Sequence, residues 1–351
     1  MTRPMIPSPA LVTTVIPTYR RPKLLRRAIE SALEQQGPSL LVRVFDNASG
    51  DETASVVAEI AARDPRLHYQ CHEKNIGAAA NFEFGLRAVN TPFFSILSDD
   101  DYLLPRFYAH ALDDLEAHPE AMFWAGMTLN VDESGKIWYA RVDGWKREGL
   151  FAPPEGMLAM MHGMAPVWTG IVFRRDVLDS VGFPDPEALG PSDFDFLLRV
   201  AAHHNYILRK CPSAVFTLSD FSFSTTQPLS SFWPGWQKIF RNVETSLTLS
   251  NHSKALALLA LHKDAKRMLF RRGVNALATE RYDYCNDAAA AFEAQYGKGL
   301  RPWMLRVVTA VCESKPLLQR FYTWSYRRAE RLLIQSRSDL QSRYGNLLKR
   351  S

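Results

Sequence analysis

Short apolar runs alternate with helix-like segments over the first hundred residues, and this alternation constrains the fold more than any other feature of the chain. Such runs are typical of buried strands, and apolar residues recurring at i, i+3 and i+4 are typical of helices. The resulting β-α-β-α-β-α-β order predicts a parallel sheet with helices on both faces. We expect strands at residues 11–16, 40–45, 67–70 and 93–97, and helices at residues 22–35, 53–62 and 78–89.

Polar loops follow three of these predicted strands at their carboxyl ends. They are Pro17–Tyr19, Asp46–Asn47 and the triplet Asp99–Asp101. In open α/β sheets, ligands bind in the crevice beyond the carboxyl ends of the strands. We therefore expect the three loops to converge on one edge of the sheet and to form a binding site there.

The aspartate triplet suggests a divalent cation. Neighbouring buried carboxylates repel each other and raise each other's pKa, and a bound cation removes this cost. Mg²⁺ or Mn²⁺ typically takes one or two carboxylates together with phosphate oxygens of the substrate. In an extended chain, the outer carboxylates of Asp99 and Asp101 would lie on the same side. The alternative is a solvated acidic turn before Pro105, but the position of the triplet at a strand end favours the metal site.

Five ordered segments resemble motifs of the family 2 glycosyltransferases, which are inverting enzymes with a GT-A fold. The resemblance implies an α/β domain of that fold, with a mostly parallel, Rossmann-like sheet and flanking helices, followed here by an α-helical C-terminal region. The matching segments are Val12–Arg20 with its Pro-Thr-Tyr turn, Val44–Thr53, Glu73–Gly77, Leu97–Asp101 and Gly190–Arg199.

The resemblance also implies a nucleotide-sugar site. The backbone around Pro17, Thr18 and Tyr19 would hold the base, with the ring of Tyr19 free to stack on it. Asp46 would accept a hydrogen bond from the ring N–H of the base, as a carboxylate can. The other residues implied for the donor are Lys74, Asn75, Asp99 and Asp100, and those implied for a Mg²⁺ or Mn²⁺ ion are Asp99 and Asp101.

Asp193 is the candidate general base, which would deprotonate an acceptor hydroxyl for attack on the anomeric carbon. A helix N-cap is the alternative role for this residue and for Ser192. Asp195, in the first turn of the same helix, is expected to interact with the helix dipole or to be a hydrogen-bond partner rather than the base. Many relatives have Glu at the position of Ser192, and some have a His after the next strand, where this chain has only Asp220 as a nearby carboxylate.

Acceptor or sugar contacts are implied for four residues, of which Trp168 is the most suggestive because an aromatic ring can stack on a sugar face. Core packing is an equally good interpretation of Trp168. The four residues are Trp168, Thr169, Gly170 and Ser192.

The chain divides into an α/β part and a helical part. We expect a catalytic domain at residues 1–230, with a nucleotide-sugar half at 11–101 and an acceptor half at 102–230, and a helical region at 231–351. The middle of the chain contains apolar runs at 122–125, 137–140 and 170–173 and a helix at 193–202. The helical region interleaves arginines with aromatic residues, a composition found in membrane-surface elements. A solvated helical face or an oligomer contact are the alternatives.

The composition excludes several classes of protein but does not identify a ligand. With 46% hydrophobic and 23% charged residues among 351, the chain can bury a core, which excludes disordered, collagen-like and disulfide-scaffold proteins. The net charge of +5 suits phosphate-bearing ligands, nucleic acid or an anionic membrane. No apolar stretch approaches the ~20 residues of a membrane span. Cys71, Cys211, Cys285 and Cys312 lack metal-ligand spacing, so we expect a cytoplasmic protein, or one peripheral to the inner face of the plasma membrane.

These features favour a metal-dependent inverting glycosyltransferase of the hexosyl or deoxyhexosyl type. UDP- or dTDP-sugars are the favoured donors, and CDP- or GDP-sugars are also compatible. The acceptor would be a glycan or lipid-linked saccharide of the cell-surface polysaccharide or O-antigen type. A nucleotidyltransferase would need a glycine-rich phosphate loop, which Pro17–Pro22 does not provide. A nucleic-acid-binding protein would leave the acidic motifs unexplained, so no nucleic-acid partner is expected.

Overall fold

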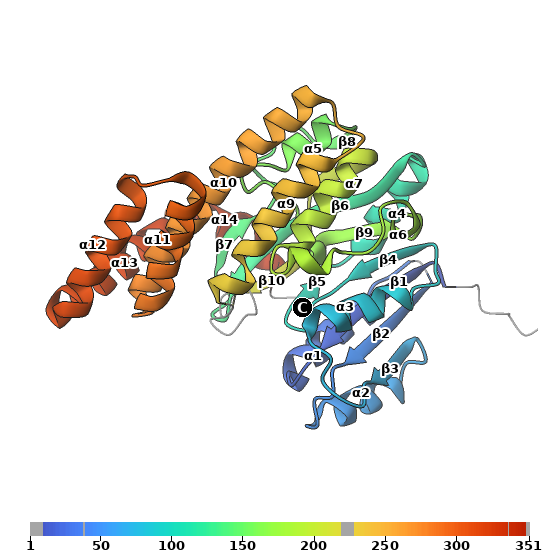
Figure 1. Cartoon of the computed structure of the whole chain (residues 1–351). Helices are drawn as coiled ribbons and strands as arrows, with labels where there is room; N and C mark the ends of the chain where they lie inside the picture. The colour runs from blue at the N-terminus through green and yellow to red at the C-terminus, as the bar shows by residue number, and fades with distance from the viewer. Residues whose placement is uncertain (1–9, 38, 219–227, 336, 349–351) are drawn as a thin grey trace, which may run out of the picture.

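The computed structural model describes residues 10–37, 39–218, 228–335 and 337–348. Over these residues, the chain builds a 10-stranded mixed sheet with the main order β3-β2-β1-β4-β9-β6-β10-β5, while β7 pairs with β6 and β8 with β10 (Figure 1). The strands are β1 (Val12–Thr18), β2 (Leu40–Asp46), β3 (Leu67–Cys71), β4 (Phe93–Ile96), β5 (Tyr102–Leu103), β6 (Ala121–Asp132), β7 (Ile137–Ala140), β8 (Gly149–Phe151), β9 (Ile171–Arg174) and β10 (Asn205–Leu218).

The helices cover this sheet and then continue beyond it. They are α1 (Pro22–Leu33), α2 (Thr53–Ala61), α3 (Ala78–Arg87), α4 (Phe107–Ala117), α5 (Glu155–Ala159), α6 (Asp176–Ser180), α7 (Ser192–His203), α9 (Trp233–Thr245), α10 (Asn251–Ala278), α11 (Tyr282–Tyr296), α12 (Leu300–Ser314), α13 (Pro316–Gln335) and α14 (Ser338–Tyr344). A short 3₁₀ turn, η1 (Trp168–Gly170), precedes β9. None of these helices, within the described ranges, is both long and apolar enough to cross a bilayer.

The first half of the sheet confirms the predicted parallel arrangement. β1 pairs in parallel with β2 and β4, and β2 pairs in parallel with β3. Every residue of β1 is buried, as expected of a central strand covered on both faces. Helix α1 starts at Pro22, whose fixed φ suits a first helical turn, and it buries Leu25, Ala28 and Ile29. The predicted segments all appear, with ends displaced by one or two residues.

The second half of the sheet contains both parallel and antiparallel pairs, so the sheet of the predicted GT-A fold is mixed as a whole. β9 runs antiparallel to both β4 and β6, whereas β10 runs parallel to β6. The ladder between β10 and β6 shifts register at Leu208/Pro212 and at Pro212/Ala214. Because proline cannot donate to a ladder, it favours such irregularities. Beyond the shift, β10 pairs with β5 and reaches the carboxyl edge of the sheet.

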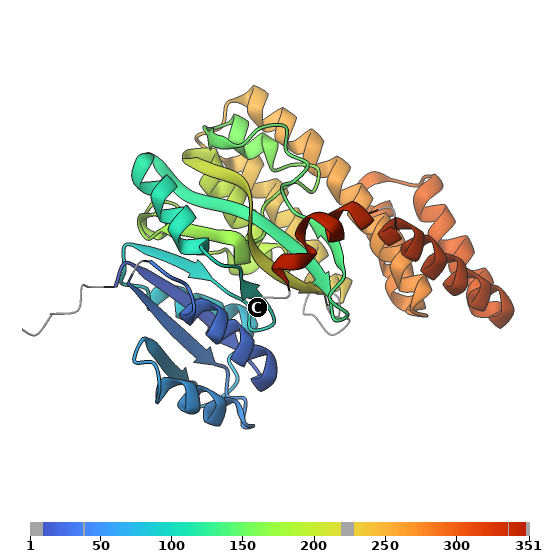
Figure 2. The same ribbon diagram turned by 180° about the vertical axis from the view of Figure 1, so that it is seen from behind.

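The C-terminal helices pack partly on the α/β part and partly away from it. The 28-residue helix α10 leads from the sheet region to α11, α12 and α13, which project to one side in both views (Figures 1 and 2). Helix α14 returns to β7, where the side chain of Gln341 accepts a hydrogen bond from the backbone N–H of Ile137 at 3.0 Å. One hydrophobic core includes side chains from Val15 to Leu340. The division at residue 230 stays a prediction.

Candidate active site

The loops after β1 and β4 meet as predicted, and hydrogen bonds join them directly. The hydroxyl of Thr18 donates to Oδ2 of Asp99 at 2.7 Å, and the backbone N–H of Tyr19 points to the same oxygen at 3.4 Å. The loop after β2 joins the group, since the N–H of Asn47 donates to the carbonyl of Thr18 at 3.0 Å. Tyr19 is 38% exposed and therefore accessible to a ligand, with the guanidinium of Arg20 5.1 Å from the centroid of its ring.

An arginine that the sequence analysis did not single out pairs with the aspartate triplet. Nη1 of Arg21 lies 3.2 Å from Oδ1 of Asp99 and 2.7 Å from Oδ2 of Asp100. Burial nevertheless raises the pKa of Asp99 to about 6, against the attraction of Arg21. The sequence signal that could have identified Arg21 is the pair of consecutive arginines directly after the Pro-Thr-Tyr turn. Arg27 supports the turn from α1 by donating to the carbonyl of Asp100 at 2.6 Å.

Asp101 is completely buried, and its partners come from β10 and η1, whereas those of Asp99 come from the end of β1 and the segment after it. Its Oδ1 accepts the backbone N–H of Thr217, on β10, at 2.9 Å, and its Oδ2 accepts the hydroxyl of Thr169. Burial, followed by repulsion from Asp100, raises its pKa. Asp99 and Asp100 form a turn, closed by the N–H of Asp101 on the carbonyl of Ser98 at 3.1 Å. The expectation of an extended chain at this triplet is therefore wrong, because a backbone hydrogen bond folds it back.

This set of oxygen donors fits a divalent cation. Mg²⁺ requires only one or two protein carboxylates when phosphate oxygens and water complete its shell. Asp99 and Asp101 supply two hard carboxylates, and burial raises the pKa of both. No group of three or more His, Cys, Asp or Glu ligands occurs within the described ranges. Asp220, the carboxylate considered as a further ligand, lies outside the described residues.

Asp46 is buried behind the predicted base site, and protein donors already engage its carboxylate. Oδ1 accepts the N–H of Ser49 at 3.0 Å as well as the hydroxyl of Ser49, and Oδ2 accepts the hydroxyl of Tyr69 at 2.6 Å. Burial and the bond to Asp46 raise the pKa of Tyr69. Each carboxylate oxygen can accept about two hydrogen bonds. The arrangement thus fixes the carboxylate and leaves an acceptor site on Oδ2.

The turn at Lys74 and Asn75 lies beside this loop. The side-chain oxygen of Asn75 accepts the amide of Asn47 at 3.0 Å and the backbone N–H of Gly77 at 2.9 Å. Both Lys74 and Asn75 are exposed. Gly77 has φ of 90°, a conformation that glycine adopts without strain. The turn therefore presents Lys74 and Asn75 next to the β2 loop, and their role at a donor site stays a prediction.

Asp193 lies in the first turn of α7 and is exposed to solvent. Its Oδ1 accepts the adjacent N–H of Phe194 at 2.7 Å, while the N-cap position belongs to Pro191. Desolvation by the surrounding protein raises the pKa of the Asp193 carboxyl, and the N–H of Phe194 and then the charge of Arg141 oppose this rise. A solvent-accessible carboxylate with a raised pKa has the properties of a general base.

Arg141 was not identified from the sequence, because only the tertiary fold brings it near Asp193. It follows β7 and donates to the carbonyl of Gly163 at 2.9 Å. Burial, followed by repulsion from Arg271 on α10, lowers its pKa. In the described part of the chain, its Nε has no hydrogen-bond partner, and the same holds for the buried side-chain oxygens of Thr128 and Asn130 on β6. These three atoms thus lack a protein partner among the described residues and are themselves shielded from solvent.

The η1 turn connects the two halves of the site. Nε1 of Trp168 donates to the carbonyl of Asp193 at 3.2 Å, and the next residue, Thr169, donates to Asp101. The ring of Trp168 is half-buried against Phe196, with ring centroids 5.6 Å apart. A Cβ on Gly170 would lie 2.4 Å from Oγ1 of Thr128, so only glycine fits there. Thr169 and Gly170 therefore position other groups, while Trp168 and Ser192 lie beside Asp193.

Asp195 is confirmed as a hydrogen-bonding partner. It is buried, its Oδ2 accepts Nε of Arg199 at 2.9 Å, and its Oδ1 accepts the amide of Asn242 at 2.7 Å. The latter bond ties α7 to α9. Asp193 and Asp195, two residues apart, therefore have different environments, one open to solvent and one fully paired.

Comparison with known proteins gives a consistent result. Residues 13–182 match the model of glycosyl transferase family 2. The uncharacterized glycosyltransferase RT0329 of Rickettsia typhi is 24% identical over 199 residues, which are 55% of this chain and 60% of that protein. The succinoglycan biosynthesis protein ExoO of Rhizobium meliloti is 34% identical over 132 residues, 38% of this chain and 35% of ExoO. The matches thus span less than two thirds of either relative.

Among solved structures, residues 1–349 of S. aureus TarS in complex with UDP-GlcNAc superpose with a TM-score of 0.61 at 16% identity, covering 91% of this chain and 92% of that one. At that identity, the likeness shows the fold alone. The coverage extends well beyond the stretch that the family model matches, so the likeness in fold includes much of the helical region as well as the sheet.

Proposed function

Since this chain belongs to glycosyl transferase family 2 through residues 13–182, we propose that it transfers a sugar from a nucleotide-sugar to a hydroxyl group of a saccharide acceptor, with inversion at the anomeric carbon. The observation that carries this proposal is the η1 turn. Trp168 bonds to α7 at Asp193 and Thr169 bonds to Asp101, so one three-residue turn fixes the spacing of the proposed base and the proposed metal carboxylate.

In the proposed reaction, Asp193 takes the proton of the acceptor hydroxyl. The acceptor oxygen forms a bond to the anomeric carbon, and the bond from that carbon to the diphosphate oxygen breaks with its electron pair moving to the nucleoside diphosphate. Attack from the face opposite the leaving group inverts the configuration. The exposure of Asp193 to solvent allows the proton to leave afterwards. A raised pKa makes its carboxylate a stronger base than an ordinary aspartate.

Asp99 and Asp101 would hold a Mg²⁺ or Mn²⁺ ion, which would neutralise charge on the departing diphosphate when bound. The protein groups around them have separate functions. Thr18 and Arg21 orient the carboxylate of Asp99, while Thr169 and the backbone of Thr217 orient that of Asp101. Rigid support of this kind reduces the reorganisation needed during reaction.

The donor is proposed to be a UDP- or dTDP-sugar of the hexosyl or deoxyhexosyl type. Uracil and thymine both carry the ring N–H that the open acceptor site of Asp46 would receive. Tyr19, exposed beside the β1 loop, offers a ring for stacking. TarS, a neighbour in fold, has been solved with UDP-GlcNAc. Asp100, Lys74 and Asn75 are proposed to line the same donor site.

The acceptor is proposed to be a cell-surface polysaccharide or lipid-linked saccharide, reached from the cytoplasmic side. Support comes from ExoO, a relative named for succinoglycan biosynthesis. On this side of the site, Trp168 offers a partly exposed aromatic ring, which can stack on the ring face of a sugar.

A panel of nucleoside diphosphates and nucleotide-sugars, with and without Mn²⁺, tests this proposal through the thermal unfolding of the full chain. We expect a uridine or thymidine diphosphate to raise the melting temperature only when Mn²⁺ is present. Asp101→Asn should lose the rise in melting temperature that depends on Mn²⁺. Asp195→Asn is the matched control and should retain this rise. If no nucleotide raises the melting temperature of the chain, with Mn²⁺ or without it, the proposed donor class is wrong.

A further inference from the structure

Helix α12 has two apolar sides, only one of which packs on the protein. Its buried side consists of Pro302, Leu305, Thr309 and Cys312. Leu305 lies against α10, where a Cβ on Gly273 would come within 2.9 Å of it. The opposite side is apolar and exposed at positions i, i+3, i+4, i+7 and i+11, an arrangement that forms one stripe along a helix. This stripe consists of Leu300, Trp303, Met304, Val307 and Val311.

Helix α13 repeats this arrangement. Gln319 is buried and donates to the carbonyl of Leu277 at 2.8 Å, and the hydroxyl of Tyr322 donates to the carbonyl of Val274 at 3.1 Å. These bonds fix which side of α13 faces α10. The outward stripe consists of Leu317, Phe321 and Trp324, which are 78%, 64% and 51% exposed.

The concentration of exposed apolar side chains here is unusual. Of the 21 large hydrophobic side chains that are exposed in the described part of the chain, 11 lie between residues 300 and 333. Single exposed apolar residues are common on soluble proteins, but contiguous patches of them mark interaction surfaces. The α12–α13 hairpin, residues 300–335, is therefore a candidate docking element.

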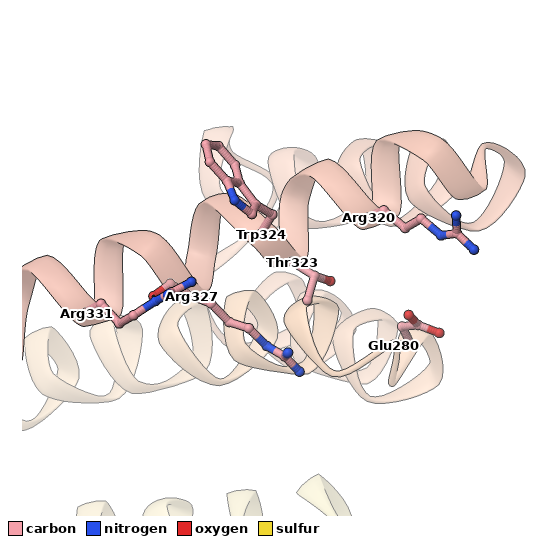
Figure 3. A pocket seen from close by; sticks show the side chains of 6 residues that line it. All are labelled: Glu280, Arg320, Thr323, Trp324, Arg327 and Arg331. Carbon is pink, nitrogen blue, oxygen red and sulfur yellow. The ribbon is translucent and has the colours of Figure 1, made fainter.

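The same hairpin has a high positive net charge. It contains seven basic and two acidic residues, a net charge of +5, which equals the net charge of the whole chain. Arg320, Arg327 and Arg331 recur at i, i+7 and i+11 and therefore form one row along α13. Figure 3 shows this row with Glu280, Thr323 and Trp324, which together line a groove of about 290 Å³.

We propose that the α12–α13 hairpin docks on an anionic lipid bilayer. The aromatic and aliphatic stripes would enter the boundary between headgroups and acyl chains, and the arginine row would contact lipid phosphates. Trp303 and Trp324 suit this boundary because tryptophan is enriched there. A second copy of the chain is a poorer occupant, since two surfaces of charge +5 repel each other.

Co-sedimentation of the full chain with vesicles tests the proposal. We expect binding to phosphatidylcholine vesicles that contain phosphatidylglycerol and little binding to phosphatidylcholine alone. Replacing Arg320, Arg327 and Arg331 by Gln should lower the partition coefficient by about 100-fold, because each basic residue contributes roughly a fivefold effect near an anionic surface. The double variant Phe321→Ser with Trp324→Ser should have a partition coefficient at least about tenfold lower, because it buries less apolar area in the bilayer.

Leu259→Ser is the matched control, because Leu259 is 71% exposed on α10 and lies outside the hairpin. It should bind as the unaltered chain does, and circular dichroism should show that all variants remain folded. Equal binding to neutral and anionic vesicles, or unchanged binding of the arginine variant, would overturn the proposal. So would sedimentation equilibrium showing a dimer that the serine variant dissociates. Vesicle binding needs no nucleotide-sugar, so its failure is distinguishable from failure of the proposed transfer reaction.

Discussion

Replacing Thr169 by Val removes one hydroxyl and leaves the shape of the side chain nearly unchanged. That hydroxyl donates to Oδ2 of Asp101, while Oδ1 retains the backbone N–H of Thr217. Asp101 and Thr169 are 0% and 2% exposed, so water does not replace the lost donor. The variant therefore leaves one oxygen of a buried carboxylate without a protein partner.

A hydrogen bond to a charged group contributes about 1.5–3 kcal/mol, so Thr169→Val should lower the free energy of unfolding by that amount without metal at a pH where Asp101 is ionised. The deficit should also depend on pH. Burial already raises the pKa of Asp101 and the Thr169 hydroxyl holds it down, so losing the hydroxyl raises this pKa further. The deficit is then largest above the pKa values of both proteins and shrinks as the pH falls and the carboxylate is protonated in the folded state.

Urea unfolding in EDTA at several pH values measures this directly. Thr169→Ser is the control, because it keeps the hydroxyl and loses only a methyl group, a loss of about 1 kcal/mol that should not vary with pH. If Thr169→Val is as stable as Thr169→Ser, or if its deficit is independent of pH, then the Thr169 bond to Asp101 does not have the assigned role.

Three further substitutions test other parts of the site. Arg141→Met should raise the pKa of Asp193, because a cation that favours its carboxylate is lost; the acid limb of kcat/KM should move to higher pH, whereas Arg141→Lys should leave it nearly in place. Gly170→Ala should cost about 1–3 kcal/mol in urea unfolding, since the new Cβ would lie 2.4 Å from Oγ1 of Thr128; an unchanged midpoint would contradict this packing. Asp195→Asn should cost about 1–3 kcal/mol of stability through its bond to Arg199, without altering the transfer rate per folded molecule.

Local sequence patterns were sufficient to predict the first half of the sheet. The strands β1, β2 and β4 are short, mainly apolar or β-branched runs, β3 is a shorter and more polar one, and helices separate them; β1 pairs in parallel with β2 and β4, and β2 with β3. The loops at their carboxyl ends could therefore be placed together from the sequence. Asp99 and Asp46 lie where that reasoning put them, at the ends of β4 and β2.

Features that depend on distant partners were not predictable from local pattern. The 14-residue strand β10 includes Pro212 and two register shifts in this region, so its sequence lacks a regular alternation. Arg141 approaches Asp193 only through the tertiary fold, in which β7 pairs with β6 and the N–H of Arg141 donates to the carbonyl of Thr128. Thr169 seemed suited to an acceptor contact, yet its hydroxyl is directed to Asp101, 68 residues earlier in the chain. Contacts of this kind are set by tertiary structure.

The central claim is that Asp193 is the base of a sugar-transfer reaction, and single-turnover transfer with a saturating nucleotide-sugar and a saccharide acceptor tests it most directly. General-base catalysis typically contributes about 10²–10⁴-fold, so Asp193→Asn should slow the transfer step by that factor while binding the donor normally. Asp195→Asn, two residues away on the same helix, should transfer at the normal rate. Normal transfer by Asp193→Asn, or equal loss in both variants, would contradict the account.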